Sequence, residues 1–268
     1  MHKQMKAKNG PISYRDVGAG LPVVLLHGFG EDSEIWNEQL PGLLPFCRLI
    51  IPDLPGSGRS PRWMESKVAM EAFADCIDEI LSRENIGECI MLGHSMGGYI
   101  TLAFAEKFPH KLSAWGLIHS SAYADTDEKI MTRKKGIQHI EAYGPQSFLK
   151  TSIPTLFSKR TQLENASIIS ALIEKGSTFS KEALIQYYQA MITRPDRRHV
   201  LKSSEIPVLF ILGTEDVAAP MKDILDQVQL PNQSFVFIIE ETGHMSMIEK
   251  PLEVTHHLTG FLKSFIAA

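Results

Sequence analysis

The sequence predicts an α/β protein with a mostly parallel sheet, helices on both of its faces and a helical cap inserted between its two halves. Short apolar runs alternate with amphipathic stretches over residues 1–122 and again over residues 204–268. Apolar strands separated by helices are typical of a parallel sheet that is buried on both faces. Residues 123–203 lie between these two parts and show helix patterns without a convincing strand.

The first part of the core contains four short apolar runs that we predict to be buried strands. They cover residues 23–26, 48–51, 90–92 and 115–118. Amphipathic helix patterns lie between them, over residues 33–44, 68–82 and 95–107. The second part continues the pattern with strands at 207–212 and 234–239 and helices at 222–229 and 252–265. This alternation is expected of a parallel sheet built from βαβ units.

The middle segment contains only helix patterns. They cover residues 126–142, 145–157, 161–175 and 180–193, with a short one near 196–202, and Gly144-Pro145, Gly176 and Pro195 punctuate them. Helices inserted between two halves of one sheet are expected to cover the carboxyl edge of its strands, where ligands of open α/β sheets bind. We therefore expect a core of residues 1–122 and 204–268 with an inserted helical cap of residues 123–203.

Composition and charge argue against several classes of partner. The chain has 268 residues and a formal net charge of −4 without a long basic run, so we expect no nucleic-acid partner. No apolar run approaches the roughly 18 residues of a membrane span, and the charged N-terminus lacks the apolar core of a signal peptide. Cys47, Cys76 and Cys89 lack metal-ligand spacing and are expected to be buried thiols. These features predict a cytoplasmic protein without a membrane partner and leave the oligomeric state open.

Gly93-His94-Ser95-Met96-Gly97 is the most informative motif of the chain. It follows an apolar run and precedes a helix pattern, which is the setting in which Gly-x-Ser-x-Gly forms a nucleophile elbow. The turn is so tight that the serine hydroxyl projects clear of the sheet, and the two glycines leave room for the crossing backbone. The helix that starts behind Ser95 supplies N–H groups and partial positive charge for an oxyanion. Ser95 is therefore the candidate nucleophile.

A nucleophilic serine needs a base within hydrogen-bond reach, and the base needs an acid to orient it. Asp216 follows the predicted strand 207–212, and His244 follows the predicted strand 234–239. Both residues are thus in loops just past strand ends, where they can meet Ser95. Glu215 and Asp125 are alternative positions for the acid.

The fourth part of such a site is an oxyanion hole, a set of hydrogen-bond donors that stabilises the oxyanion. His27-Gly28-Phe29-Gly30 follows the predicted strand 23–26, and a glycine-rich turn there can aim a backbone N–H inward. We expect the Phe29 and Met96 N–H groups to be the two donors, each contributing on the order of 3 kcal/mol of transition-state stabilisation. Gly28, Phe29 and Met96 are then expected to bind substrate, with the Phe29 and Met96 side chains lining the pocket.

Together these segments resemble the α/β-hydrolase superfamily, in its capped branch. The resemblance covers nearly the whole chain outside the cap and rests on five motifs: His27-Gly28-Phe29, Asp53-Leu54-Pro55-Gly56-Ser57-Gly58-Arg59-Ser60, Gly93-His94-Ser95-Met96-Gly97-Gly98, Gly213-Thr214-Glu215-Asp216 and Gly243-His244. It implies a sheet of the eight-stranded type, with Ser95 as nucleophile, His244 as general base and then acid, and Asp216 as the orienting acid. The implied chemistry is attack on a carbonyl, an acyl-enzyme and its hydrolysis by water.

Other polar residues have structural roles in this interpretation. Asp53 is expected to hydrogen-bond loop backbone, His27 to stabilise its turn, and His94 to point away from the pocket. His256-His257 has no carboxylate or cysteine at ligand spacing, so we expect neither a metal nor a cofactor. The basic run 194–198 is expected to be a solvated face, with a role in holding an anionic substrate as the alternative.

A serine nucleophile argues against the branches that form an alkyl ester on a carboxylate, such as haloalkane dehalogenases and epoxide hydrolases. Apolar residues are frequent in the cap, and those that face the cleft are expected to make the pocket apolar. We therefore expect a carboxylesterase-like serine hydrolase that acts on a small-molecule ester with a small to medium acyl group. The alternatives are a carbon–carbon bond or lactone hydrolase, a perhydrolase, or a non-catalytic small-ligand receptor of the same fold.

Overall fold

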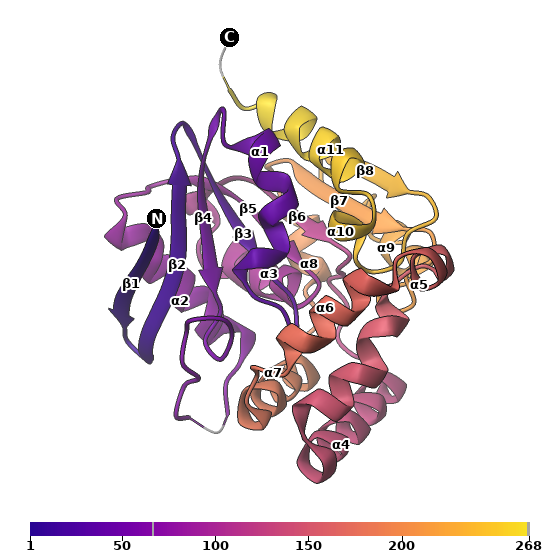
Figure 1. Ribbon diagram of the computed structural model, residues 1–268. Coiled ribbons are helices and arrows are strands. Elements are labelled where there is room, and N and C mark those ends of the chain that lie inside the picture. Colours follow the sequence, from indigo (N-terminus) through magenta and orange to yellow (C-terminus); the bar gives the residue numbers. More distant parts are fainter. Residues whose placement is uncertain (66, 267–268) are drawn as a thin grey trace.

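The computed structural model describes residues 1–65 and 67–266. The strands in this part of the chain form one sheet of eight strands (Figure 1). The strand order is β1-β2-β4-β3-β5-β6-β7-β8. The strands from β4 to β8 along this order pair in parallel, whereas β2 pairs antiparallel with both β1 and β4. The predicted fold class, a mostly parallel eight-stranded sheet with helices, is therefore confirmed.

Each strand predicted from an apolar run is present. These strands are β3 (Leu21–Leu26), β4 (Cys47–Asp53), β5 (Cys89–His94), β6 (Leu112–Ile118), β7 (Val208–Gly213) and β8 (Ser234–Ile239). Every residue of β5 and of β7 is buried. Such strands are apolar along most of their length because helices exclude water from both of their faces.

The two N-terminal strands, β1 (His2–Ala7) and β2 (Gly10–Gly18), were not predicted from the sequence. β1 is an edge strand whose residues alternate between exposed and partly buried, so it contains no apolar run. Lys3 on β1 forms ion pairs with Asp16 at 2.6 Å and with Glu84 at 2.7 Å. Charged side chains of this kind keep an exposed edge from pairing with another chain.

Helices cover both faces of the sheet, as Figure 1 shows. Behind the sheet in this view, α2 (Met70–Arg83) packs against α3 (Met96–Lys107), with η2 (Pro109–Lys111) after it. In front, α11 (Pro251–Lys263) packs against η1 (Ser33–Gln39), α1 (Leu40–Leu43) and α10 (Ser246–Glu249). The predicted helix 33–44 is thus a 3-10 turn that leads into a short α-helix, and the predicted helix 222–229 is shorter, as α9 (Met221–Leu225).

Helices fill the chain between β6 and β7. They are α4 (Asp127–Ser152), η3 (Ile153–Leu156), α5 (Lys159–Glu164), α6 (Ala166–Gly176), α7 (Lys181–Thr193) and α8 (Arg198–Lys202). Gly144 has a φ of 82° and kinks α4 at the position where the sequence predicts a break between two helices. We call α4, α6 and α7 the cap helices. None of the helices in the described part of the chain is both long enough and apolar enough to span a membrane.

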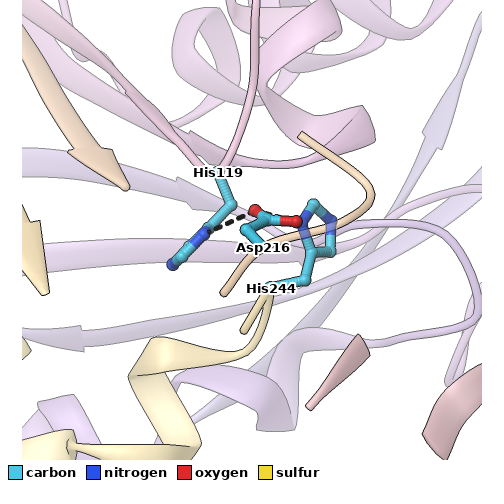
Figure 2. A group of neighbouring side chains, drawn as sticks. All are labelled: His119, Asp216 and His244. Atoms are coloured by element: carbon cyan, nitrogen blue, oxygen red, sulfur yellow. Dashed lines mark hydrogen bonds and ion pairs between the residues drawn. The ribbon is translucent and has the colours of Figure 1, made fainter. Parts of the chain in front are cut away.

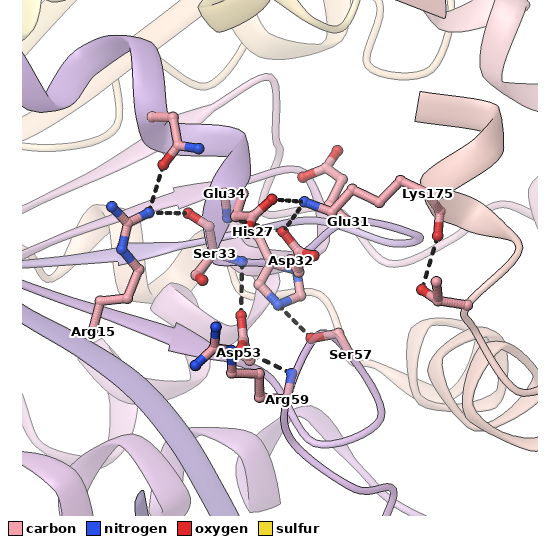
Figure 3. Close-up of polar contacts among 12 residues, drawn as sticks. Arg15, His27, Glu31, Asp32, Ser33, Glu34, Asp53, Ser57, Arg59 and Lys175 are labelled. Atoms are coloured by element: carbon pink, nitrogen blue, oxygen red, sulfur yellow. Dashed lines mark hydrogen bonds and ion pairs between the residues drawn. The ribbon is translucent and has the colours of Figure 1, made fainter. Parts of the chain in front are cut away.

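Polar contacts fasten the loop after β3 to its surroundings (Figure 3). Lys175 on α6 reaches Asp32 at 2.6 Å and Glu34 at 2.7 Å, and so links a cap helix to the core. Asp53 at the end of β4 accepts hydrogen bonds from the Ser33 and Arg59 N–H groups, at 3.0 and 2.9 Å. Asp53 therefore holds loop backbone, the structural role expected for it.

The basic run 194–198 is not the solvated face that the sequence suggested. Arg197 is only 2% exposed and pairs with Glu71 and Glu106, which come from α2 and α3. Arg194 is buried beside Asp125, and only Arg198 of the three arginines is exposed. Acidic residues from distant segments meet these arginines after folding, which a linear pattern of charges does not show.

Candidate active site

Ser95 occupies the sharp turn between β5 and α3. Its backbone has φ 50° and ψ −114°, a conformation rarely populated by residues other than glycine. A Cβ on Gly93 would lie 2.2 Å from the Gly97 carbonyl oxygen, and one on Gly97 would lie 2.6 Å from the Leu26 carbonyl oxygen. The glycines of the motif are therefore required by the close approach of three backbone segments.

Asp216 and His244 come together from the loops after β7 and β8 (Figure 2). His244 Nδ1 and Asp216 Oδ2 are 2.8 Å apart, and both side chains are buried. The other oxygen of Asp216 accepts the Ala218 and Ala219 N–H groups at 2.8 and 2.9 Å, which fixes the carboxylate. The alternative acid Glu215 is exposed and instead accepts the Lys159 N–H at 3.0 Å.

A second histidine, which the sequence analysis did not single out, binds the same carboxylate. His119 follows β6, and its Nδ1 lies 2.9 Å from Asp216 Oδ2 (Figure 2). Burial lowers the pKa of His119, so the ring is neutral. A carboxylate only accepts hydrogen bonds, so Nδ1 carries the proton and Nε2 accepts from the Ser246 hydroxyl at 2.6 Å. The sequence feature that could have identified His119 is its position directly after the predicted strand 115–118.

The surroundings of Asp216 keep its carboxylate ionised. Burial alone would raise the pKa of Asp216, but the His244 and His119 rings outweigh that effect and hold the pKa well below its usual range. His119, Asp216 and His244 are also close enough to be considered as metal ligands, with ligand atoms within 4.8 Å of one another. Because both Nδ1 atoms already face the carboxylate as hydrogen-bond donors, the cluster is better suited to holding protons than to binding an ion.

The two backbone N–H groups expected to bind the oxyanion come from different segments: Phe29 lies in the loop after β3, and Met96 is the first residue of α3. Neither the Phe29 N–H nor the Met96 N–H donates a hydrogen bond to a loop or side chain in the described residues. His27 holds this loop: its Nδ1 donates to the Gly28 carbonyl at 2.8 Å and its Nε2 accepts the Leu54 N–H at 3.0 Å. His27 therefore has the turn-stabilising role that the sequence suggested.

His94 connects the loop after β3 to the loop that carries His244. Its Nδ1 donates to Glu31 at 3.0 Å and its Nε2 donates to the His244 carbonyl oxygen at 2.9 Å. Burial opposes ionisation of both groups, but each charge favours the other, so the pKa of His94 is raised and that of Glu31 is lowered. The result is a buried ion pair that fixes the position of the His244 loop relative to the loop after β3.

Ser95 and His244 open onto a cavity of about 150 Å³ beneath the cap helices. Phe29 lines this cavity and stacks on Tyr188 of α7, with ring centroids 4.3 Å apart. Met96 is fully buried in the core, and neither its side chain nor Gly28 lines the cavity, in contrast to expectation. Met96 is the first residue of α3, and its side chain packs between helix and sheet.

The cavity is less apolar than the cap composition suggested, because Arg133 and Glu31 also line it. In the described part of the chain the Ser95 hydroxyl makes no hydrogen bond to another side chain. Catalytic hydrogen bonds of this kind are often formed only when substrate is bound. A carbonyl placed in this cavity would meet a serine on a strained turn and a histidine held by a carboxylate.

Comparison with known proteins supports the fold described above. A family model described as alpha/beta hydrolase fold matches residues 22–139. A thermophilic esterase from Thermogutta terrifontis, solved with malate bound, superimposes with a TM-score of 0.92 at 28% identity, covering 98% of each chain. A 2-hydroxy-6-oxo-2,4-heptadienoate hydrolase of Pseudomonas putida is 27% identical over 88% of this chain and 86% of its own length.

A further relative is larger than this chain. The dihydrolipoyllysine-residue acetyltransferase component of the acetoin cleaving system of Pseudomonas putida is 26% identical over 91% of this chain, which spans 64% of that protein's length. These relatives and neighbours thus include an esterase, a hydrolase and an acetyltransferase component.

Proposed function

The chain belongs to the α/β-hydrolase superfamily and is a hydrolase of that fold, and on this premise we propose that it is a serine esterase for small-molecule substrates with a small to medium acyl group. One observation carries the proposal most strongly. Ser95 stands on a strained turn and faces the same cavity as His244, whose Nδ1 is bound to the ionised Asp216. This combination is what acyl transfer by a serine requires.

In the proposed reaction, Ser95 Oγ attacks the ester carbonyl while His244 Nε2 takes its proton. Asp216 keeps the Nδ1–H tautomer of His244 and stabilises the positive charge that forms on the ring. The Phe29 and Met96 N–H groups donate to the oxyanion of the tetrahedral intermediate. His244 then gives the proton to the leaving alcohol, and the same residues activate a water molecule that hydrolyses the acyl-enzyme.

The cap limits the size of the acyl group in the proposed substrate. We propose that residues 123–203 act as a cap unit on the core formed by residues 1–122 and 204–268, in a cytoplasmic enzyme. Leu156, Tyr188 and Met191 from this segment line the cavity together with Phe29 and Ala218. A cavity of about 150 Å³ holds a short acyl group without rearrangement, whereas a long chain requires the cap helices to move.

Hydrolysis of p-nitrophenyl esters from acetate to decanoate tests this proposal. We expect wild type to hydrolyse the short esters best, and Ser95→Ala to lose at least about a thousandfold in kcat because the members of a catalytic triad act as a unit. Ser170→Ala, on the exposed surface of α6, is the matched control and should retain full activity. Undiminished turnover by Ser95→Ala would exclude Ser95 as the nucleophile.

Carbon–carbon bond hydrolysis is the second candidate, because the chain is similar over most of its length to the Pseudomonas putida dienoate hydrolase. A 2-hydroxy-6-oxo-dienoate is strongly coloured, and loss of its absorbance reports cleavage. Cleavage of this substrate together with failure to hydrolyse any ester would replace the esterase proposal by this one.

A further inference from the structure

One positive charge in the catalytic cavity has no part in the proposed acyl transfer. Arg133 on α4 lines the same cavity as Ser95 and His244. Its side chain is 19% exposed, so the guanidinium is largely withdrawn from solvent. A charge held in this way needs a counter-charge, because burying an unpaired ion is costly.

Asp125 balances only part of the charge around Arg133. Its fully buried carboxylate accepts hydrogen bonds from Arg133 Nε at 2.6 Å and from Nη2 at 3.2 Å. The same carboxylate pairs at 2.8 Å with Nη1 of Arg194, which is itself 4% exposed and packs over the Tyr99 ring. Two guanidinium groups therefore share one carboxylate, and the cluster carries one excess positive charge.

Arg133 still has hydrogen-bonding capacity to offer. Within residues 1–65 and 67–266, its Nη1 donates no hydrogen bond. The face of the Tyr188 ring lies 5.6 Å from the guanidinium carbon and, together with Asp125, fixes the plane of the group. A guanidinium that is oriented in advance binds an anion at a lower entropic cost.

The other charged groups near the cavity are already neutralised. Glu31 lines the cavity, but it accepts the Gly28 N–H at 2.7 Å and forms the buried ion pair with His94. Asp216 lies behind His244 with its side chain 0% exposed, and its two oxygens accept four hydrogen bonds. Arg133 is thus the charged group of the cavity that lacks a full counter-charge.

We propose that Arg133 binds a carboxylate of the substrate, so that the ester cleaved at Ser95 is a short half-ester of a dicarboxylic acid. This inference rests on the esterase proposed above. One excess positive charge matches one carboxylate, whereas a phosphate monoester brings a charge closer to −2. The carboxylate and the ester have to share one cavity of about 150 Å³, which favours a short diacid.

Two methyl esters of nearly equal shape test the proposal. Monomethyl succinate carries the carboxylate, and methyl succinamate replaces it by a neutral amide. We expect wild type to favour monomethyl succinate by tenfold or more in kcat/KM, measured by methanol release. Arg133→Gln should reduce this preference to within twofold, because the carboxylate loses its counter-charge while Arg194 still neutralises Asp125.

A matched control variant and an inhibition measurement distinguish failure of the Arg133 proposal from failure of the proposed function. Arg198→Gln removes an exposed arginine that pairs with Asp196 and should leave the preference unchanged. Inhibition of wild type by succinate, compared with succinamide, tests anion binding if Arg133→Gln does not fold. Failure to hydrolyse any p-nitrophenyl ester would contradict the proposed function. In an enzyme that hydrolyses p-nitrophenyl esters, hydrolysis of neither methyl ester, equal hydrolysis of both, or equal inhibition by both compounds would contradict the role of Arg133 alone.

Discussion

Replacing Gly93 by alanine tests whether the elbow at Ser95 depends on backbone contact. The added Cβ would lie 2.2 Å from the Gly97 carbonyl oxygen, 2.3 Å from its carbonyl carbon and 2.5 Å from the Gly98 nitrogen. All three atoms belong to the backbone of the first turn of α3, so no side chain can rotate to make room. The methyl group fits only if α3 moves away from β5.

The size of this effect follows from the distances. Overpacking a well-packed core typically costs 1–3 kcal/mol and occasionally more, and we expect Gly93→Ala to reach at least about 3 kcal/mol because only backbone can move. Ser95 lies between Gly93 and Gly97 and would be displaced with them. A misplacement of about 1 Å in a catalytic group can cost about a hundredfold in rate, so kcat/KM should fall by about that factor in whatever protein still folds.

Urea unfolding followed by circular dichroism measures the stability, and ester hydrolysis measures the rate. Gly87→Ala is the matched control, since no atom lies within 4 Å of its added Cβ and its φ is not positive. This variant should be unchanged or up to about 1 kcal/mol more stable, because alanine restricts the unfolded chain. A Gly93→Ala protein within 1 kcal/mol of wild type and with undiminished kcat/KM would refute the argument.

Two further predictions concern the carboxylate at the centre of the site. The folded-state pKa of Asp216 lies below that of the unfolded chain, so its carboxylate stabilises the fold above about pH 4 and progressively less as the pH falls. The difference in unfolding free energy between wild type and Asp216→Asn should therefore be large at pH 7 and narrow below about pH 4, and a constant difference from pH 7 to pH 3 would contradict this. His119→Leu removes a donor to a buried carboxylate and should be about 2 kcal/mol less stable than His119→Asn, whose amide can still donate to Asp216. Equal urea midpoints for these two variants would show that the His119 hydrogen bond contributes little.

Most of the sheet was predictable because its strands are short, apolar and bounded by helices. The exceptions are β1, an edge strand with polar residues that face solvent, and β2, whose buried stretch at residues 12–14 includes Ser13 and forms no apolar run. Gly144, in contrast to β1 and β2, is a feature that the sequence pattern did indicate. It was predicted to separate two helices and does interrupt the helical backbone, although the helix continues on both sides of it.

The sequence by itself determined which strand ends bear Ser95, Asp216 and His244. Parallel strands place their carboxyl ends along one edge, so residues just past those ends gather there whatever the details of packing. Only the tertiary structure decided the contacts between these residues and others. Asp216 is shared by His244 and His119, and Asp125, an alternative acid in the sequence, pairs with Arg133 and Arg194 instead. These pairings depend on distances of a few ångströms between segments far apart in the chain, and no local pattern of residues encodes them.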